Sequence, residues 1–205
     1  MIDFYSAQSS NGQRVAIMLE ECELAYTVHK VDLQGGEQRK PEFLAVNPAG
    51  AIPAIVDHDG PGGKRFALAQ SAAIVLYLAE KTGRFLPKDA ARRAQALQWV
   101  TQATSDVAAA SGAIFLLSTY APDKSDANVA FFEERTLKHL RAADQRLADR
   151  QYLADELSVA DFSLYPICVV RRPLIDRAGD LKNLVRWADE LGKRPGVQRG
   201  MVAAK

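Results

Sequence analysis

The chain has 205 residues, of which 48% are hydrophobic and 25% are charged, a composition typical of globular proteins and unlike that of disordered or fibrous ones. Lysine and arginine total 26 and aspartate and glutamate total 25, so the net charge of +1 gives no positive surplus for binding nucleic acid. No apolar run approaches the roughly 20 residues of a membrane span, and the first residues lack the features of a secretory signal. We therefore expect a cytoplasmic protein with no nucleic-acid or membrane partner.

The two cysteines, Cys22 and Cys168, lie far apart in the sequence, and the three histidines are scattered. Neither residue type shows the close spacing of a metal site or of a CxxC redox pair. We predict no metal site and interpret the cysteines as small buried residues.

The first eighty residues alternate short strand patterns with helical ones. A helix between two strands favours a parallel pair with a right-handed crossover, because the helix must pack back on the sheet. Gly83 is in the right place to end the last helix of this part. The predicted strands span 2–5, 26–33, 54–56 and 66–68, and the predicted helices span 11–24, 41–46 and 70–81.

From about residue 89 the strand patterns disappear. The predicted helices span 90–120, 128–150, 158–170 and 183–191, with a short piece after Pro195. The sequence therefore predicts an α/β domain over 1–82, in the order βαβ-α-ββα, followed by an all-helical domain over 89–205.

Pro53 stands directly before the predicted strand 54–56, and by itself it indicates only a turn or the start of a strand. Together with the order of the elements and with Gln70-Ser71 at the start of a helix, the dipeptide Ile52-Pro53 resembles the glutathione transferase superfamily. The resemblance covers essentially all 205 residues. It implies a thioredoxin-like N-terminal domain that binds glutathione and a helical domain that carries the site of a second substrate.

The resemblance also implies which residues bind the tripeptide. The proline that matches Pro53 is cis in the family, and the backbone of the preceding residue, Ile52 here, pairs with the ligand like an added strand. Ser71 and the amides of the helix that it begins would receive the γ-glutamyl carboxylate. The family more often has glutamate where this chain has Gln70. Gln38 corresponds to a glutamine near the glycyl end of the ligand.

The family places the group that stabilises the glutathione thiolate between the first strand and the first helix. The segment that begins with Ser9, Ser10 and Asn11 is similar to the Thr-x-Asn signature of the bacterial Nu class, with Ser9 in place of threonine. This similarity implies that Ser9, Ser10 and Asn11 are the catalytic residues. One of them is equally suited to be an ordinary helix cap, and Tyr5 is either a competing donor or a core residue. No cysteine lies in this segment, which argues against a mixed disulfide with the protein.

The implied function is that of a transferase-like enzyme with glutathione as cosubstrate and no metal. It would reduce disulfides or hydroperoxides, or conjugate electrophiles in detoxification, as a cytoplasmic homodimer. One alternative is a zeta-like maleylacetoacetate isomerase, since Ser9-Ser10 with Arg14-Val15 resembles the opening of that class. Another is a non-catalytic interaction module with the transferase fold.

A further motif concerns folding. Ser158 and Asp161 form the pattern of a capping box at the start of helix 158–170. The related family pattern carries a glycine four residues before the serine, where this chain has Ala154. We expect strain at Ala154 if that position needs a left-handed backbone.

Overall fold

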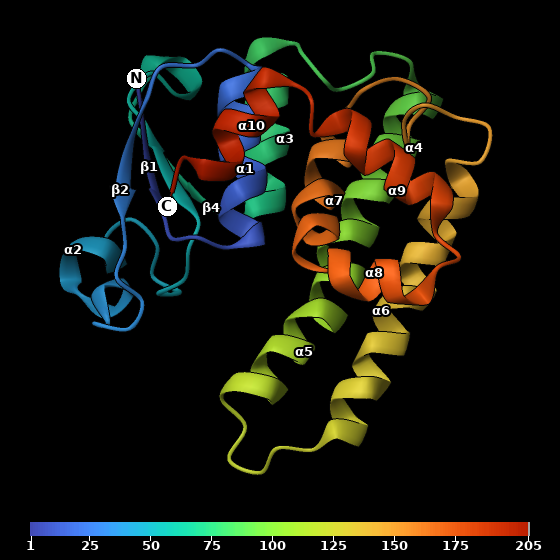
Figure 1. Cartoon of the computed structure of the whole chain (residues 1–205). Helices are drawn as coiled ribbons and strands as arrows, with labels where there is room; N and C mark the ends of the chain where they lie inside the picture. The colour runs from blue at the N-terminus through green and yellow to red at the C-terminus, as the bar shows by residue number, and fades with distance from the viewer. Residues whose placement is uncertain (205) are drawn as a thin grey trace. The chain divides into compact units, whose positions relative to one another are not determined.

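The structure, a computed structural model, describes residues 1–204. These residues form two compact units (Figure 1). The first contains Met1–Arg84 together with the segment that begins at Lys193, and the second is Phe85–Gly192. The sequence predicts an α/β domain over 1–82 and an all-helical one over 89–205, whereas in the structure the segment that begins at Lys193 packs with the first unit.

A four-stranded sheet is the centre of the first unit. Its strands are β1 (Ile2–Ser6), β2 (Tyr26–Lys30), β3 (Ala54–Asp57) and β4 (Phe66–Ala69), in the order β2-β1-β3-β4. β1 and β2 are parallel, whereas β3 is antiparallel to both β1 and β4, which confirms the predicted crossover and hairpin. β2 stops at Lys30, before the predicted end, because the Asp32 carboxylate accepts bonds from the following amides and forms a turn.

Three helices lie together on one side of the sheet, and a short helix lies on the other side (Figure 1). α1 buries Val15–Leu19 completely, which is more than the one apolar face that the spacing predicts, because α10 covers the side of Ile17. α3 ends at Gly83, which has a left-handed backbone with φ 66°. The helices are α1 (Ser10–Glu21), α3 (Ser71–Thr82), α10 (Pro195–Val202) and, on the other side, α2 (Pro41–Leu44). Two 3₁₀ turns, Glu37–Arg39 and Pro61–Gly63, complete the unit.

The C-terminal helix α10 packs directly on α1. A Cβ atom added to Gly200 would lie 2.5 Å from both the Cα and the N atom of Ile17, so the two backbones approach closely. Arg194 donates two hydrogen bonds, of 3.0 and 2.7 Å, to the buried carboxylate of Glu21. These contacts explain why the C-terminal segment belongs to the first unit, which helical periodicity alone does not reveal.

The second unit is helical throughout. Its elements are α4 (Ala90–Thr101), a π-helical segment (Gln102–Val107), α5 (Ala108–Thr119), α6 (Asp126–Arg146), α7 (Val159–Val170), α8 (Arg172–Ala178) and α9 (Lys182–Leu191). The predicted long helix 90–120 is continuous from α4 to α5 and contains the π-helical segment. α8 was not predicted.

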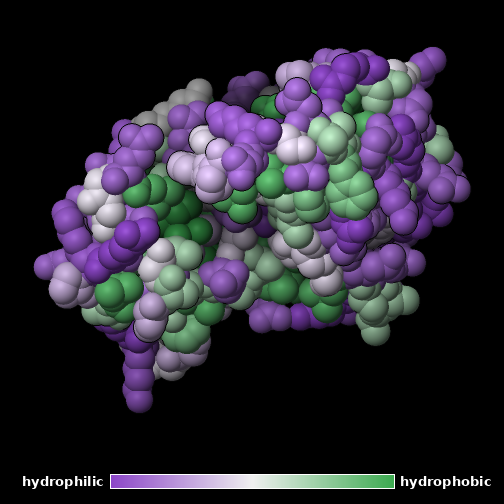
Figure 2. Space-filling model, turned by 90° about the horizontal axis from the view of Figure 1, so that it is seen from below, coloured by the Kyte–Doolittle hydropathy of each residue, from purple (hydrophilic) through white to green (hydrophobic). Residues whose placement is uncertain are grey.

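By length and composition, the helical stretch Ala90–Thr119 is long and apolar enough to cross a membrane. This differs from the expectation that no apolar run approaches the length of a membrane span. Trp99, Val107 and Ile114 are buried in it, and the stretch packs against α6 and α7. A core helix of a helical bundle passes the same test, so one such helix is weak evidence for a membrane span. Figure 2 shows mostly hydrophilic side chains on the face seen from below, with smaller hydrophobic areas between them.

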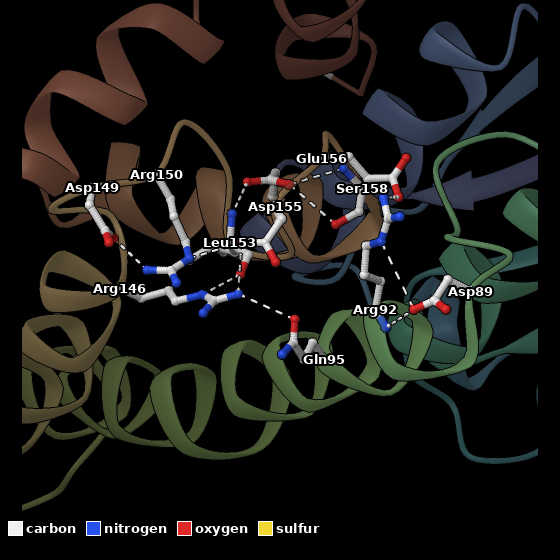
Figure 3. Close-up of polar contacts among 11 residues, drawn as sticks. Asp89, Arg92, Gln95, Arg146, Asp149, Arg150, Leu153, Asp155, Glu156 and Ser158 are labelled. Carbon is white, nitrogen blue, oxygen red and sulfur yellow. Dashed lines mark hydrogen bonds and ion pairs between the residues drawn. The ribbon is translucent and has the colours of Figure 1, made fainter.

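The predicted capping box at the start of α7 is present. The Ser158 hydroxyl accepts from the Ala160 amide, and the buried Asp161 carboxylate accepts from the Ser158 amide at 3.0 Å. The left-handed residue before the cap is Asp155, with φ 66°, and not Ala154, so the strain expected at Ala154 does not occur. Figure 3 shows Arg146 and Arg150 directed at the Asp155 carboxylate, at 3.2 and 2.9 Å.

Candidate functional site

The register of the sheet brings three chain segments to one edge of the first unit. Tyr5 of β1 pairs with Ala54 of β3, and Ala54 pairs with Ala69 of β4, so the three residues form one row across the sheet. The chain leaves β1 and β4 at this row and enters β3 there. The segment before α1, the dipeptide before β3 and the segment before α3 therefore all begin at the same edge.

The first of these segments ends in the N-terminus of α1. Ser9 is the N-cap, and its hydroxyl oxygen accepts from the Gly12 amide at 3.1 Å. Ser10 and Asn11 are the first two helical residues, and the side chain of Asn11 is exposed. Since Ser9 satisfies only the Gly12 amide, the amides of Ser10 and Asn11 are available to an anion.

The third segment ends in the N-terminus of α3. Gln70 is the N-cap, is exposed and has φ 72°. Its side chain makes no capping hydrogen bond, so the first amides of α3 are not covered by it. Ser71 is the first helical residue and is buried, and its hydroxyl accepts a hydrogen bond of 3.1 Å from Arg14 Nη1.

The second segment holds the predicted proline. The Ile52-Pro53 peptide bond is cis, as the resemblance implied. Ile52 is half-buried and lies before the first paired residue of β3. Gln38 lies close by, because its carbonyl oxygen is 3.2 Å from the position that a Cβ atom on Gly50 would occupy.

Gln38 has one satisfied and one unsatisfied side-chain atom. Its Nε2 donates to the Leu33 carbonyl at 3.2 Å, while its buried Oε1 has no hydrogen-bond partner. A buried acceptor of this kind is costly to leave unpaired, so it fits a position beside a ligand that carries N–H groups.

Tyr5 is half-buried and packs against a small apolar cluster with Phe43. Its ring stacks on His29 with centroids 4.6 Å apart, and it meets Phe43 of α2 edge to face. Burial raises the pKa of its phenol, which favours the neutral form. Of the two interpretations that the sequence left open, the packing supports the core residue.

Both cysteines are buried and free. Burial raises the pKa of the Cys22 thiol, and it raises that of Cys168 to about 12. Neither sulfur is a thiolate at neutral pH, so neither suits nucleophilic chemistry. Among residues 1–204, no group of three or more His, Cys, Asp or Glu side chains is placed to hold a metal ion.

The fold and this edge, with two helix N-termini beside a cis-proline, define a protein of the thioredoxin-like transferase class. The N-terminal domain family of glutathione S-transferases matches residues 8–81. The chain is 35% identical to the disulfide-bond oxidoreductase YfcG of Escherichia coli K12, over 100% of this chain and 96% of that protein. It is also 35% identical to the disulfide-bond oxidoreductase YghU of the same organism, over 98% of this chain and 74% of that protein. The chain belongs to the glutathione S-transferase family.

Solved structures agree with this assignment. A glutathione transferase from Pseudomonas putida, solved with one glutathione disulfide per subunit, matches with a TM-score of 0.93 and 32% identity, over 100% of this chain and 92% of that one. A glutathione transferase from Burkholderia graminis, solved with two glutathione molecules per subunit, matches with a TM-score of 0.90 and 35% identity, over 100% and 88%. The predicted family and transferase fold are confirmed, and so is an enzyme of the transferase type.

Proposed function

We propose that the edge of the first unit binds glutathione and that the enzyme uses its thiolate to reduce disulfides. In this proposal Ser9, Ser10 and Asn11 stabilise the sulfur. The proposal is supported most directly by the sheet register, which brings the segments before α1 and α3 to one edge of the sheet. In addition, both cysteines are buried and the pKa of each thiol is raised. The edge offers donors for an anionic ligand, and the reactive thiolate has to come from that ligand.

The proposal assigns the other contacts of the ligand to the remaining predicted residues. The tripeptide backbone pairs with Ile52 beside Pro53, and the γ-glutamyl carboxylate lies at Gln70 and Ser71, where the first amides of α3 are not capped by a side chain. The unpaired Oε1 of Gln38 accepts an N–H group of the ligand. With Ser9, Ser10 and Asn11 at the sulfur, the proposal gives each predicted site residue a place at this edge of the first unit.

The reaction proceeds by two thiol–disulfide exchanges. The bound glutathione thiolate attacks one sulfur of the substrate disulfide, a new S–S bond forms, and the substrate's other sulfur leaves as a thiolate. A second glutathione thiolate then attacks the mixed disulfide and releases glutathione disulfide and the second substrate thiol. Two glutathione molecules are oxidised for each disulfide reduced. The ligands of the two bacterial relatives in crystals, glutathione disulfide in one and two glutathione molecules in the other, support this stoichiometry.

Calorimetry and a substrate panel test the proposal. Glutathione should bind with a dissociation constant in the range of about 1 μM to 1 mM that is usual for enzyme substrates. A model disulfide should be turned over faster than a hydroperoxide or an electrophile such as a chloronitrobenzene. Turnover of maleylacetoacetate in place of the disulfide would favour the isomerase, and no binding heat would favour an interaction module.

We also propose that the enzyme is a cytoplasmic homodimer with a role in detoxification. Exposed apolar side chains gather at the end of α5 and the start of α6, and a cluster of this kind suits a protein interface. They are Phe115, Leu116, Tyr120 and Phe131. Light scattering should give twice the mass of one chain, and Phe131→Ser should lower that value if this cluster forms the interface.

A further inference from the structure

Arg14 is a buried charge without an ion-pair partner among residues 1–204. Its side chain is 1% exposed, and of its three nitrogens only Nη1 has a hydrogen-bond partner, the Ser71 hydroxyl. Nε and Nη2 have none. Burial lowers the pKa of the guanidinium to about 10, so Arg14 is still positively charged at neutral pH.

Buried charges in proteins are normally paired, because removing an ion from water is expensive. Nε and Nη2 are too deeply buried to bond to a ligand directly. The unpaired charge of the guanidinium nevertheless favours an anion from outside the protein at a nearby position. Arg14 does not support the fold through an ion pair, since burial is the only influence on its pKa and no acidic side chain contributes.

The hydrogen bond from Arg14 to Ser71 links the buried charge to the N-terminus of α3. The Ser71 oxygen accepts from Arg14, so the serine's own proton points away from the arginine and is free to donate. Ser71 also begins α3, whose first amides lack a side-chain cap. The Ser71 hydroxyl and the first amides of α3 are thus donors at the N-terminus of that helix, and the charge of Arg14 lies next to Ser71. A carboxylate at this position accepts hydrogen bonds from these donors and is attracted by the charge.

We propose that Arg14 is a positioning residue for the α-carboxylate of the γ-glutamyl group: it orients the Ser71 hydroxyl toward that carboxylate and supplies its countercharge from below. This inference rests on the proposed function, in which glutathione occupies the edge. It also states which group at the γ-glutamyl end of the ligand the site recognises. With neutral Gln70 at the surface and Arg14 beneath, the site selects the carboxylate more strongly than the ammonium group.

Two ligand analogues separate these contributions. One is 4-aminobutyryl-Cys-Gly, which lacks only the α-carboxylate, and the other is glutaryl-Cys-Gly, which lacks only the amino group. Titration calorimetry on the wild-type protein should show that the first analogue binds about 10- to 100-fold more weakly than glutathione, as expected for loss of a charge-assisted hydrogen bond. The second should lose less than the first.

The variants Arg14→Met and Arg14→Lys complete the test. Arg14→Met should weaken glutathione binding by about 10- to 100-fold and bind glutathione and 4-aminobutyryl-Cys-Gly with nearly equal affinity. Arg14→Lys should restore part of the difference between the two ligands. The melting temperature of Arg14→Met without ligand should be unchanged or higher, because an uncompensated buried charge is replaced by an apolar side chain of similar length.

Several outcomes would overturn the role of Arg14. A wild-type protein that binds 4-aminobutyryl-Cys-Gly as tightly as glutathione removes the carboxylate site, and this comparison needs no variant to fold. An Arg14→Met protein that loses affinity for both ligands by the same factor, with a lower melting temperature, shows a structural role only. A wild-type protein that binds none of the three ligands refutes the proposed function itself.

Discussion

At the scale of single residues, Ser9 is the N-cap of α1, and in the proposed function it also donates to the glutathione sulfur. Its hydroxyl oxygen caps α1 by accepting from Gly12, which leaves its proton free to donate to a ligand. Asn11 has an exposed side chain that α1 does not need for its cap. Substitution of Ser9 should therefore lower both activity and stability, whereas substitution of Asn11 should lower activity alone.

Asn11→Ala should lower kcat/KM for a disulfide substrate by about 100-fold, the effect of losing one preorganised donor to a developing anion. The thiol of bound glutathione should then titrate at higher pH, which moves the pH–rate profile in the same direction. The melting temperature should not change. Steady-state kinetics across pH and thermal unfolding measure these quantities.

Ser9→Ala should reduce activity and also destabilise the protein by about 1 kcal/mol, because the Gly12 amide loses its cap. Tyr5→Phe is the control, since the Tyr5 ring packs on His29 and Phe43 away from α1. Full activity in both Asn11→Ala and Ser9→Ala, together with loss of activity in Tyr5→Phe, would make the tyrosine the donor.

The segments of the proposed site were predictable from the sequence because a short motif marks each of them. Ile52-Pro53 and Gln70-Ser71 are recognisable from neighbouring residues, and the sheet register then brings them to one edge. In the sequence, Arg14 is recognisable only as part of an opening similar to that of the zeta class, and this similarity gives it no role. Its importance depends on the contact with Ser71, 57 residues further along the chain, and on missing partners that a linear pattern does not contain.

At the scale of elements, the packing of α10 on α1 depends on the absence of a side chain at Gly200. Gly200→Ala places a methyl group 2.5 Å from backbone atoms of Ile17, which cannot rotate away. We expect a destabilisation of about 1–3 kcal/mol in urea unfolding, as for other overpacked sites.

Gly112→Ala is the matched control for this substitution. Gly112 also lies inside a helix, α5, but an added Cβ atom meets nothing within 4 Å. This variant should be unchanged or more stable by about 0.5–1 kcal/mol, because alanine favours a helix over glycine. Equal destabilisation of the two variants would contradict the close approach of α10 to α1.

The cap of α7 makes stability depend on pH. Burial raises the pKa of Asp161 to about 6 from 3.8, although hydrogen bonds from Leu153, Trp187 and Ser158 partly oppose the shift. Because the folded pKa is the higher one, this contribution to stability is complete below about pH 4 and is lost as the pH rises through about 6.

Asp161→Asn cannot titrate and serves as the reference for this effect. The unfolding free energy of the wild type minus that of the variant should fall by about 3 kcal/mol between pH 3.5 and pH 7. Denaturant titrations at a series of pH values measure this difference. A difference that stays constant, or rises with pH, would show that the hydrogen bonds outweigh burial and that Asp161 is ionised throughout.

The elements themselves were mostly predictable from periodicity and turn residues. Exceptions occur where a local contact overrides the pattern, as at Asp32, which turns the chain before the predicted end of β2. α8 was missed because it spans only Arg172–Ala178, directly after α7, and is too short for a clear apolar face.

At the scale of the whole molecule, the first unit is built from both ends of the chain. Glu20 and Glu21 of α1 hold Arg199 and Arg194, at 2.6 and 2.7 Å respectively. A sequence pattern shows that a helix follows Pro195, but it does not show which of two apolar cores the helix completes. This is why the sequence groups the segment after Lys193 with the helical domain, whereas the structure packs it with the first unit.

Ending the chain at Gly192 should therefore weaken the first unit selectively. Amide hydrogen exchange in α1 should become faster by several orders of magnitude, because its packed face loses α10, while exchange in α7 should remain slow. Mass spectrometry of peptides from the two helices measures both rates. Equal acceleration in both helices would mean that the units unfold together, and no change in α1 would mean that α10 contributes little.

The packing of α10 on α1 determines when the first unit can be completed during translation. The first 84 residues leave the ribosome early, yet the helix that covers α1 emerges only after the whole second unit, Phe85–Gly192, has been translated. A nascent chain that ends before Arg199 already contains the residues of the proposed glutathione site. It lacks the hydrogen bond from Arg199 to Glu20, which helps to hold α10 on α1. The ability to hold the tripeptide should accordingly be acquired only after the second unit and α10 have been translated.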